Sequence, residues 1–506
     1  MKMTLKLSRI ALAMATLGTT PAALALTPTQ IAAGPTTYVW LSGSSSTTNA
    51  VFRSVMSLCN GLAGNLGIND AHMYLEGGGI EPGHVYGLPN KVGSRFAYAC
   101  TMSSAAGSLN GKKVVMYHTV EGGSFNAHAP HLSMAGEPDP QGYLPGNLKR
   151  LNNLALLGGT GKCAAGPAGS TLVTLNGVPW SIGRYTGCDD VVTKTFTTTL
   201  KGDVAGLPGQ SYPDGGFSDT EYLINKQNLD IALNLSSIGD EVAINIGQAF
   251  GVAVSYPLYL QLQKNDVAAG VLAATCDDGS ATVPNLTPAC QPSLPAQRYT
   301  TIANRDSIGG VDGGLFGGPA GSIVNLVRRV PTSGTQSASN LRFSNKPCAT
   351  GLSQGALEPA RATDSTPTAI VTEQSTAGHV KDTLNTATGA GQFALGVVSM
   401  ENIPTPTATN NRWAFVKLDD VSPNFDTQQR AKAMDGAYTF WYELAVFTAG
   451  GSISPASPSA AALITAVAAT LGESDLKGIF ATPLFGGSGS ASKGARFGNS
   501  CLPAGQ

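Results

Sequence analysis

The chain has 506 residues, with 31 Lys and Arg against 32 Asp and Glu, so its formal net charge is −1. Charged residues make up only 12% of it, about half of the usual ~25%. A balance this even argues against a nucleic-acid-binding protein, which normally carries a basic patch. The 62 glycines follow no fixed period, which excludes a collagen-like repeat, and the 42% hydrophobic share can fill a core. The length predicts two or three domains, or a two-lobed body with long insertions.

The first 25 residues have the parts of a secretory signal peptide. Three basic residues within the first nine positions precede a short apolar stretch at 10–17, and 23–25 is a small-x-small cleavage site. We therefore expect cleavage near Ala25 and a periplasmic or secreted bacterial protein. The longest later apolar stretch, 460–471, is much shorter than the ~20 residues of a membrane span, so no span is expected in the mature chain.

Eight cysteines in an exported chain predict a set of disulfides. None forms a C-x-x-C pair, so zinc binding and thioredoxin-type chemistry have little support. Pairing of neighbours along the chain is the simplest arrangement, although sequence alone does not prove it. That arrangement gives Cys59–Cys100, Cys163–Cys188, Cys276–Cys290 and Cys348–Cys501.

Apolar strands alternate with amphipathic helices along the chain, which is typical of an α/β fold with a largely parallel sheet. Residues 38–41 are predicted to form a buried strand, followed by the hydroxyl-rich loop 42–49 and a helix whose apolar face spans 51–62. A strand at 113–118 runs into the glycine-containing loop 121–126. Further strands are expected at 242–246, 251–255, 394–400, 413–418 and 438–447, and helices at 375–385 and 460–471. Three Gly-, Pro- and Ser-rich stretches are expected to be surface insertions: 136–170, 276–297 and 450–459.

The most informative segment begins at Arg329. Ser333, Gly334 and Thr335 stand at a predicted helix start, where two hydroxyls join backbone N–H groups that have no partner within the helix. Together with the helix dipole, these donors form an anion site. Arg329, four residues before Ser333, offers a planar two-pronged donor that matches the edge of a phosphate.

This Arg-x-x-x-Ser-Gly-Thr segment resembles the phosphate-gripping segment of the periplasmic phosphate-binding proteins that serve ABC importers. Three other segments resemble that family in the right order. Residues 43–48 resemble its first loop, which holds phosphate through a Thr hydroxyl and adjacent N–H groups, and 122–124 resemble its Ser-containing second loop. Residues 216–219 resemble its Gly-x-Ser-Asp turn, whose Asp takes the proton of hydrogen phosphate. Residues 394–398 look like the family's return strand, so the similar islands span roughly 37–447.

The resemblance implies an α/β, two-lobed periplasmic-binding-protein-like fold of type II. Its first lobe would hold 26–256 and 400–506, its second 257–399, and the lobes would close on hydrogen phosphate. It implies a monomeric solute-binding protein that is not an enzyme, needs no cofactor or metal, and delivers phosphate to an ABC permease. The residues that it assigns to phosphate binding are Thr47, Thr48, Ser124, Asp219, Arg329, Ser333, Gly334 and Thr335.

The chain departs from the family in two places. The stretches between the first three segments are longer than usual and contain Cys59/Cys100 and Cys163/Cys188, so they are expected to be disulfide-clamped insertions. At the position after the first-loop Thr, where the family usually has an aromatic residue, this chain has Thr48.

The residue types also predict an anion preference without the family. Sulfate would face Asp219 with no proton between two acceptors, which should cost more than the ~1–3 kcal/mol of a neutral unsatisfied group. Arsenate is not distinguished from phosphate by this argument.

Two other functions stay open. In a secreted phosphatase on the same fold, Ser124 or Thr47 would need a base or metal, with His118, His128 or Glu121 as candidates. A surface or matrix protein would keep the fold without serving transport, and its long insertions would be the interaction surface.

Three further motifs have weaker support. His128 and His131 could bind a metal, but histidines three apart in a polar segment are more often surface residues. Residues 351–355 fit G-x-S-x-G without the strand that should precede it. Lys162 lacks the glycine spacing of a P-loop.

Overall fold

The computed structural model describes most of the chain. The described residues are 26–60, 70–76, 94–154, 163, 170–175, 178–202, 211–277, 279–280, 282–348, 356–402, 404, 412–423, 436–471, 479–481 and 499–502. The predicted signal peptide, Lys162 and the 351–355 motif lie outside them. Within these ranges, every helix is too short or too polar to cross a membrane.

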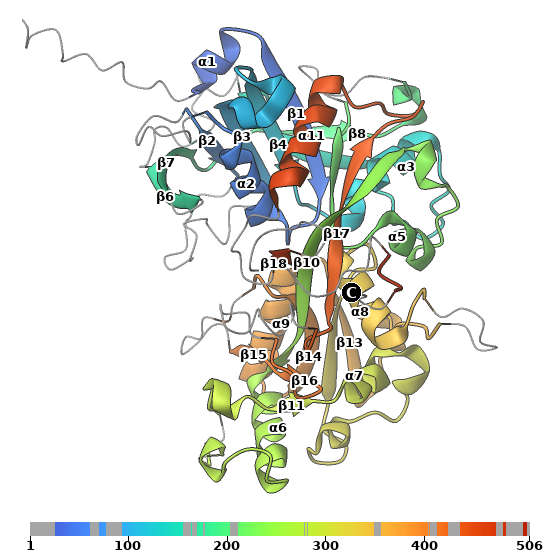
Figure 1. The fold of residues 1–506 in the computed structure, drawn as a ribbon. Coiled ribbons are helices and arrows are strands. Elements are labelled where there is room, and N and C mark those ends of the chain that lie inside the picture. Colours follow the sequence, from blue (N-terminus) through green and yellow to red (C-terminus); the bar gives the residue numbers. More distant parts are fainter. Residues whose placement is uncertain are drawn as a thin grey trace, which may run out of the picture. The chain divides into compact units, whose positions relative to one another are not determined.

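The fold is mixed α/β (Figure 1). The helices are α1 (Pro28–Ala32), α2 (Thr48–Ser57), α3 (Ala129–Ala135), α5 (Tyr222–Asn228), α6 (Tyr256–Ala268), α7 (Ala296–Ala303), α8 (Gly334–Ser344), α9 (Ala377–Gly389) and α11 (Pro458–Thr470). The first strands are β1 (Thr36–Gly43), β2 (His72–Leu75), β3 (Arg95–Thr101), β4 (Lys113–Thr119), β5 (Asn147–Leu151), β6 (Ser170–Leu175), β7 (Val178–Tyr185), β8 (Val191–Thr195) and β9 (Gly215–Ser218). The later strands are β10 (Gly239–Ser255), β11 (Ser293–Leu294), β12 (Val324–Arg329), β13 (Ala369–Gln374), β14 (Phe393–Ser399), β15 (Trp413–Phe415), β16 (Lys417–Leu418), β17 (Trp441–Ala449) and β18 (Ile479–Ala481).

The chain divides into two compact units. The first unit holds 1–39, 55–117 and 150–192, and the second unit holds 40–54, 118–149 and 193–506. Every residue assigned to phosphate binding from the sequence belongs to the second unit. The lobe boundaries expected near 256 and 400 stay a prediction.

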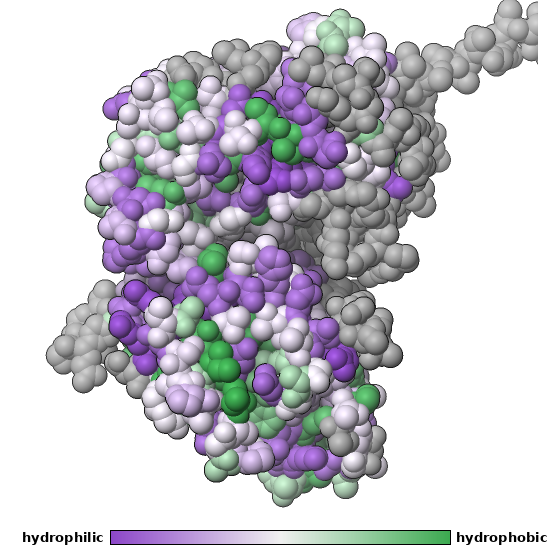
Figure 2. All heavy atoms as spheres, turned by 180° about the vertical axis from the view of Figure 1, so that it is seen from behind, coloured by the Kyte–Doolittle hydropathy of each residue, from purple (hydrophilic) through white to green (hydrophobic). Residues whose placement is uncertain are grey.

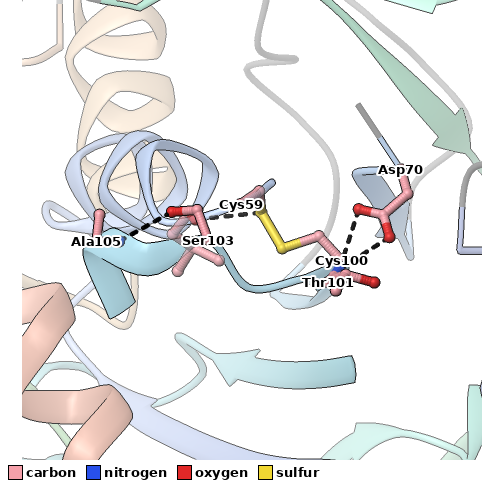
Figure 3. Close-up of a disulfide and its surroundings, with 7 residues drawn as sticks. Cys59, Asp70, Cys100, Thr101, Ser103 and Ala105 are labelled. Carbon is pink, nitrogen blue, oxygen red and sulfur yellow. Dashed lines mark hydrogen bonds between the residues drawn. A yellow bond between two sulfur atoms is a disulfide. The ribbon is translucent and has the colours of Figure 1, made fainter. Parts of the chain in front are cut away.

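In the first unit, β3, β2, β7 and β6 follow one another across the sheet. Pairing is antiparallel for β2–β3 and β6–β7 and parallel for β2–β7. The Cys59–Cys100 disulfide joins the residues after α2 to β3 (Figure 3). Beside it, both carboxylate oxygens of Asp70 accept from the Thr101 N–H at 3.0 Å. The described residues of this stretch thus form strands β2 and β3 beside a disulfide, and their being an insertion stays a prediction.

The second unit has a mixed sheet, so the expected largely parallel sheet is wrong. Its strands follow the order β13-β12-β14-β10-β17-β9-β1. The pairs β12–β13, β12–β14 and β1–β9 are parallel, whereas β10 pairs antiparallel with both β14 and β17, and β17 with β9. The long strands β10 and β17 lie side by side (Figure 1).

Strand β10 joins two strands that the sequence predicts separately, at 242–246 and 251–255. It runs without a break over 239–255, and its register with β17 shifts between Ile244 and Gly247. A shift of this kind is a β-bulge, which bends a strand without ending it. The glycine that interrupts the apolar pattern therefore marks a bulge inside one strand. The opposite error occurs at 413–418, where one predicted strand is two, β15 and β16.

The core of the second unit lies around the middle of this sheet. Apolar side chains of β10, β12, β14 and β17 are buried together with those of α6, α7 and α9. Helix α9 packs on β12 and β14, and α8 packs on the same two strands and on α5. The strands whose ends form the candidate site are therefore anchored in a packed core.

The four disulfides are the neighbour pairs that the sequence predicts. Cys348–Cys501 ties the C-terminal residues to the second unit. Next to it, Glu221 accepts from the N–H and hydroxyl of Ser500, the hydroxyl at 2.6 Å. The C-terminal segment is therefore fixed both covalently and by hydrogen bonds.

One face of the molecule carries hydrophilic and hydrophobic residues interspersed over its described part (Figure 2). The large apolar side chains that are exposed come from separate elements and loops, among them Leu223 on α5, Val242 on β10 and Leu357. Scattered apolar residues of this kind are normal on a protein surface.

Candidate functional site

The four segments singled out in the sequence meet in the second unit. Asp219 lies at their centre and is 3% exposed. Its Oδ1 accepts hydrogen bonds from the hydroxyls of Ser44 and Ser46, and its Oδ2 accepts from Ser124 at 2.9 Å. Three hydroxyls from two distant loops therefore converge on one carboxylate.

The pairing of β1 with β9 brings the first loop to Asp219. The two strands are parallel, with Gly43 opposite Phe217 and the Ser44 N–H donating to the Phe217 carbonyl at 2.8 Å. Gly43 has φ +123°, and a Cβ there would collide with the Phe217 carbonyl oxygen. Only glycine fits this turn and close approach, so the strand end is shaped to present the serines that follow.

The second loop lies against the start of α8. The Phe125 N–H donates to the Thr332 carbonyl at 3.1 Å, and the Thr332 hydroxyl donates to the Gly122 carbonyl at 3.2 Å. Gly123, at φ +89°, leaves room for Ser333, whose Cα would lie 3.2 Å from a Cβ at that position. The loop that carries Ser124 is thereby docked onto the Ser-Gly-Thr segment.

The helix α8 begins directly beside the carboxylate. A Cβ on Gly334, its first residue, would lie 2.5 Å from the Asp219 Cβ and 2.7 Å from Oδ2. Ser333 caps the helix with its carbonyl, which accepts from the N–H groups of Gln336 and Ser337, while its side chain makes no capping bond. The first N–H groups of an α-helix have no intrahelical partner and favour negative charge. These amides stand next to Ser124 and Asp219.

Arg329 ends β12 and is only 5% exposed. Its Nη2 donates to the Ser375 carbonyl at 2.9 Å, and its buried Nε has no hydrogen-bond partner among the described residues. Burial lowers the pKa of the guanidinium to about 10, against the opposing charges of Asp219 and Glu401. The group therefore stays positive at neutral pH, and its Nε is a donor that no described residue satisfies.

The hydroxyls of the first-loop threonines bond carbonyl groups of their own loop. Thr47 is fully buried and its hydroxyl donates to the Ser44 carbonyl at 2.9 Å. The half-buried Thr48 donates to the Ser45 carbonyl at 2.8 Å. Thr335, the second residue of α8, is buried, and no hydrogen bond joins it to Asp219 in the described part of the chain. Of the predicted set, Ser124, Asp219 and Gly334 are in close contact, and Arg329 and Ser333 lie near them.

Sequence reasoning missed three residues of this cluster. Ser44 and Ser46 belong to the hydroxyl-rich loop already singled out, but their role depends on the β1–β9 register, which the loop's composition does not reveal. Glu401 comes just after the predicted return strand; its charge acts on Arg329, and the charge of Asp219 acts on Glu401. Its position, as a carboxylate directly after that strand, was the sequence signal that could have identified Glu401.

The histidines are not surface residues, so the surface interpretation of His128 and His131 is wrong. His128 is the N-cap residue of α3, His131 lies within α3, and both are fully buried in ring contact with Phe447 of β17. His128 Nε2 lies 2.9 Å from Glu241, and His131 Nδ1 lies 2.7 Å from the Ser454 hydroxyl. Within the described ranges no group of three or more His, Cys, Asp or Glu is placed to hold a metal.

Comparisons with known proteins add little. No protein-family model and no curated protein matches this chain. One similar solved structure is described as a possible phosphate binding protein from Planctomyces limnophilus. The two share 13% identity with a TM-score of 0.24, and the match covers 47% of this chain and 64% of that one, less than two thirds of its length. A likeness this slight carries no argument about fold or ligand.

Proposed function

We propose that this protein captures inorganic phosphate, as hydrogen phosphate, beside Asp219 and Arg329, and that it is an exported solute-binding protein for ABC-type uptake. The observation that carries the proposal is the meeting of Ser124, Asp219 and the first amides of α8 in one place, with the Arg329 guanidinium buried nearby.

The chemistry of the cluster fits a protonated tetrahedral anion. The α8 amides and Arg329 provide donors for its oxygens, and charge-assisted bonds of this kind are the strong ones. The hydroxyls of Ser44, Ser46 and Ser124 can both donate and accept. Asp219 provides an acceptor for the proton of the anion. Donors on neutral dipoles require no basic protein, in keeping with the net charge of −1.

The position of Asp219 sets the expected selectivity. Hydrogen phosphate and hydrogen arsenate bring a proton to the carboxylate. Sulfate brings none, so a sulfate oxygen and the Asp219 carboxylate would face each other as two acceptors. We expect sulfate to bind at least about tenfold more weakly, since an unpaired buried acceptor costs ~1–3 kcal/mol.

The test is a calorimetric titration of the mature chain with phosphate, arsenate and sulfate, repeated on Asp219→Asn. The amide can donate to sulfate, so this variant should lose most of the preference for phosphate over sulfate. Lack of binding of all three anions by the wild-type chain would refute the proposal. An unchanged preference for phosphate over sulfate in Asp219→Asn would show that Asp219 does not discriminate between the two anions.

The phosphatase alternative lacks an observation of this kind. The Ser124 hydroxyl bonds Asp219, and His128, one of its candidate bases, bonds Glu241. Incubation with a chromogenic phosphate monoester, with and without zinc, separates the two functions. Turnover by the wild-type chain that disappears in Ser124→Ala would favour the enzyme.

A further inference from the structure

The cluster around Asp219 contains a second carboxyl group, from Glu401, that the resemblance to phosphate-binding proteins does not assign. Strands β12 and β14 run parallel with Val327 opposite Gly396. Arg329 is therefore level with Val398, and Glu401 comes three residues later at the same end of the sheet. Carboxyl ends of parallel strands share one edge, which is where open α/β sheets bind ligands.

Glu401 is held in place by uncharged polar groups. Its Oε1 accepts from the Ser399 hydroxyl at 2.6 Å and from Asn402 Nδ2 at 3.2 Å. Its Oε2 accepts from Gln248 Nε2 at 3.3 Å, on the neighbouring strand β10. The side chain is thus fixed between β10 and β14, and no ion pair compensates its charge within the described residues.

Three charged groups face it from the surrounding elements: Asp219 after β9, Arg329 at the end of β12 and Lys381 on α9. Lys381 lies beyond Asn402, whose Oδ1 accepts from its ammonium at 2.8 Å. Burial above all, and the Asp219 carboxylate to a smaller extent, raise the pKa of the Glu401 carboxyl to about 7, while Ser399 and Lys381 oppose that rise. Glu401 therefore changes charge near neutral pH.

A bound phosphate changes this balance. With Glu401 ionised, two carboxylates and a divalent anion would share one guanidinium, and their like charges would repel one another. With Glu401 neutral, the repulsion from its side disappears and its hydroxyl becomes a donor.

We propose that Glu401 is a proton-dependent specificity residue of the anion site, which is neutral when phosphate is bound, so that capture takes up one proton. The inference rests on the proposed function. By linkage, a site that takes up a proton on binding must lose affinity as the pH rises. The protein's own contribution to binding is then largest in acidic surroundings.

The test compares the wild-type chain with Glu401→Gln, an isosteric and permanently neutral variant, in phosphate titrations across pH. The ratio of the wild-type to the variant Kd should be close to one at about pH 6 and rise to about 30 at about pH 8.5. The speciation of phosphate is common to both chains and cancels in this ratio. Glu358→Gln is the matched control, because Glu358 is an exposed carboxylate paired with Lys346 at 3.0 Å. Its ratio should stay at one throughout.

A second measurement needs no variant. At about pH 8.5 free phosphate is almost entirely the dianion, so proton uptake on binding belongs to the protein. Wild-type titrations in two buffers of different ionisation enthalpy should show that uptake. Binding without uptake, or a ratio that stays constant with pH, would overturn the role of Glu401 and leave the proposed function standing. Absence of phosphate binding in both chains at every pH would overturn both.

Discussion

The acceptor side and the donor side of the candidate site are built differently. On the acceptor side, three serine hydroxyls already bond Asp219. On the donor side, Arg329 has one bond to a carbonyl and a buried Nε without a partner in the described part of the chain, and the first amides of α8 stand at a helix start.

The difference shows which half depends on a ligand. Asp219 accepts three hydrogen bonds from its own neighbours, so it is stabilised without a ligand. The guanidinium and the α8 amides remain donors in excess of their protein acceptors, so an added anion should gain most of its binding energy there. Substitutions on the donor side should therefore weaken binding more than substitutions of the serines.

The largest effect is expected from Arg329→Ala. Loss of a buried charged donor should weaken phosphate binding about 100-fold, in line with the ~2–5 kcal/mol of a buried hydrogen-bonded charge. The melting temperature of the unliganded protein should change little, because Arg329 forms no ion pair with a described carboxylate. Calorimetry and thermal unfolding measure the two effects. Arg342→Ala is the control, since Arg342 lies in the last turn of α8 and pairs with Asp419. Wild-type affinity in Arg329→Ala would contradict the comparison.

A smaller effect is expected from Gly334→Ala. The new methyl group would press on the Asp219 side chain and on Ser124, and overpacking of this kind costs ~1–3 kcal/mol. We expect phosphate binding to weaken about tenfold by calorimetry. Gly378→Ala makes the same change at the start of α9, where the nearest atom, Thr376 Oγ1, is 3.5 Å away. Equal losses in the two variants would show that close packing against Asp219 does not matter.

The smallest effect is expected from Ser124→Ala. Asp219 keeps two of its three hydroxyl donors, and a single hydrogen bond contributes ~1 kcal/mol, so the affinity should fall about fivefold. Ser133→Ala is the control, because the Ser133 hydroxyl bonds the Ala129 carbonyl within α3. If Ser124→Ala lost more phosphate affinity than Arg329→Ala, binding would depend mainly on the acceptor side and not on the donor side.

The sequence predicted the parts of the site better than their partners. Asp219, Ser124 and the start of α8 stand in short motifs whose local conformation the glycines largely determine. That Ser44 and Ser46 bond Asp219 depends on a strand pairing between residues 174 positions apart, Leu41 with Gly215. Local pattern carries no such information.

The same limit explains the errors in the fold. Strand β17 lies between β9 and β10 and pairs antiparallel with both, which makes the sheet mixed. Its position follows from long-range packing, whereas the alternation of strands and helices is equally compatible with a parallel sheet. His128 and His131 mislead for a related reason, because their segment looks polar but packs against Phe447 of β17.

The C-terminal bond has a consequence for how the protein must be made. Cys501 is joined to Cys348, just past α8, and its neighbour Ser500 bonds Glu221, two positions after Asp219. These bonds connect the segment that carries Asp219, the acceptor, to α8, the helix whose first amides are the donors. A product folded in a reducing cytosol would lack the covalent tether, and one shortened by its last seven residues would also leave the buried Glu221 without its two donors from Ser500.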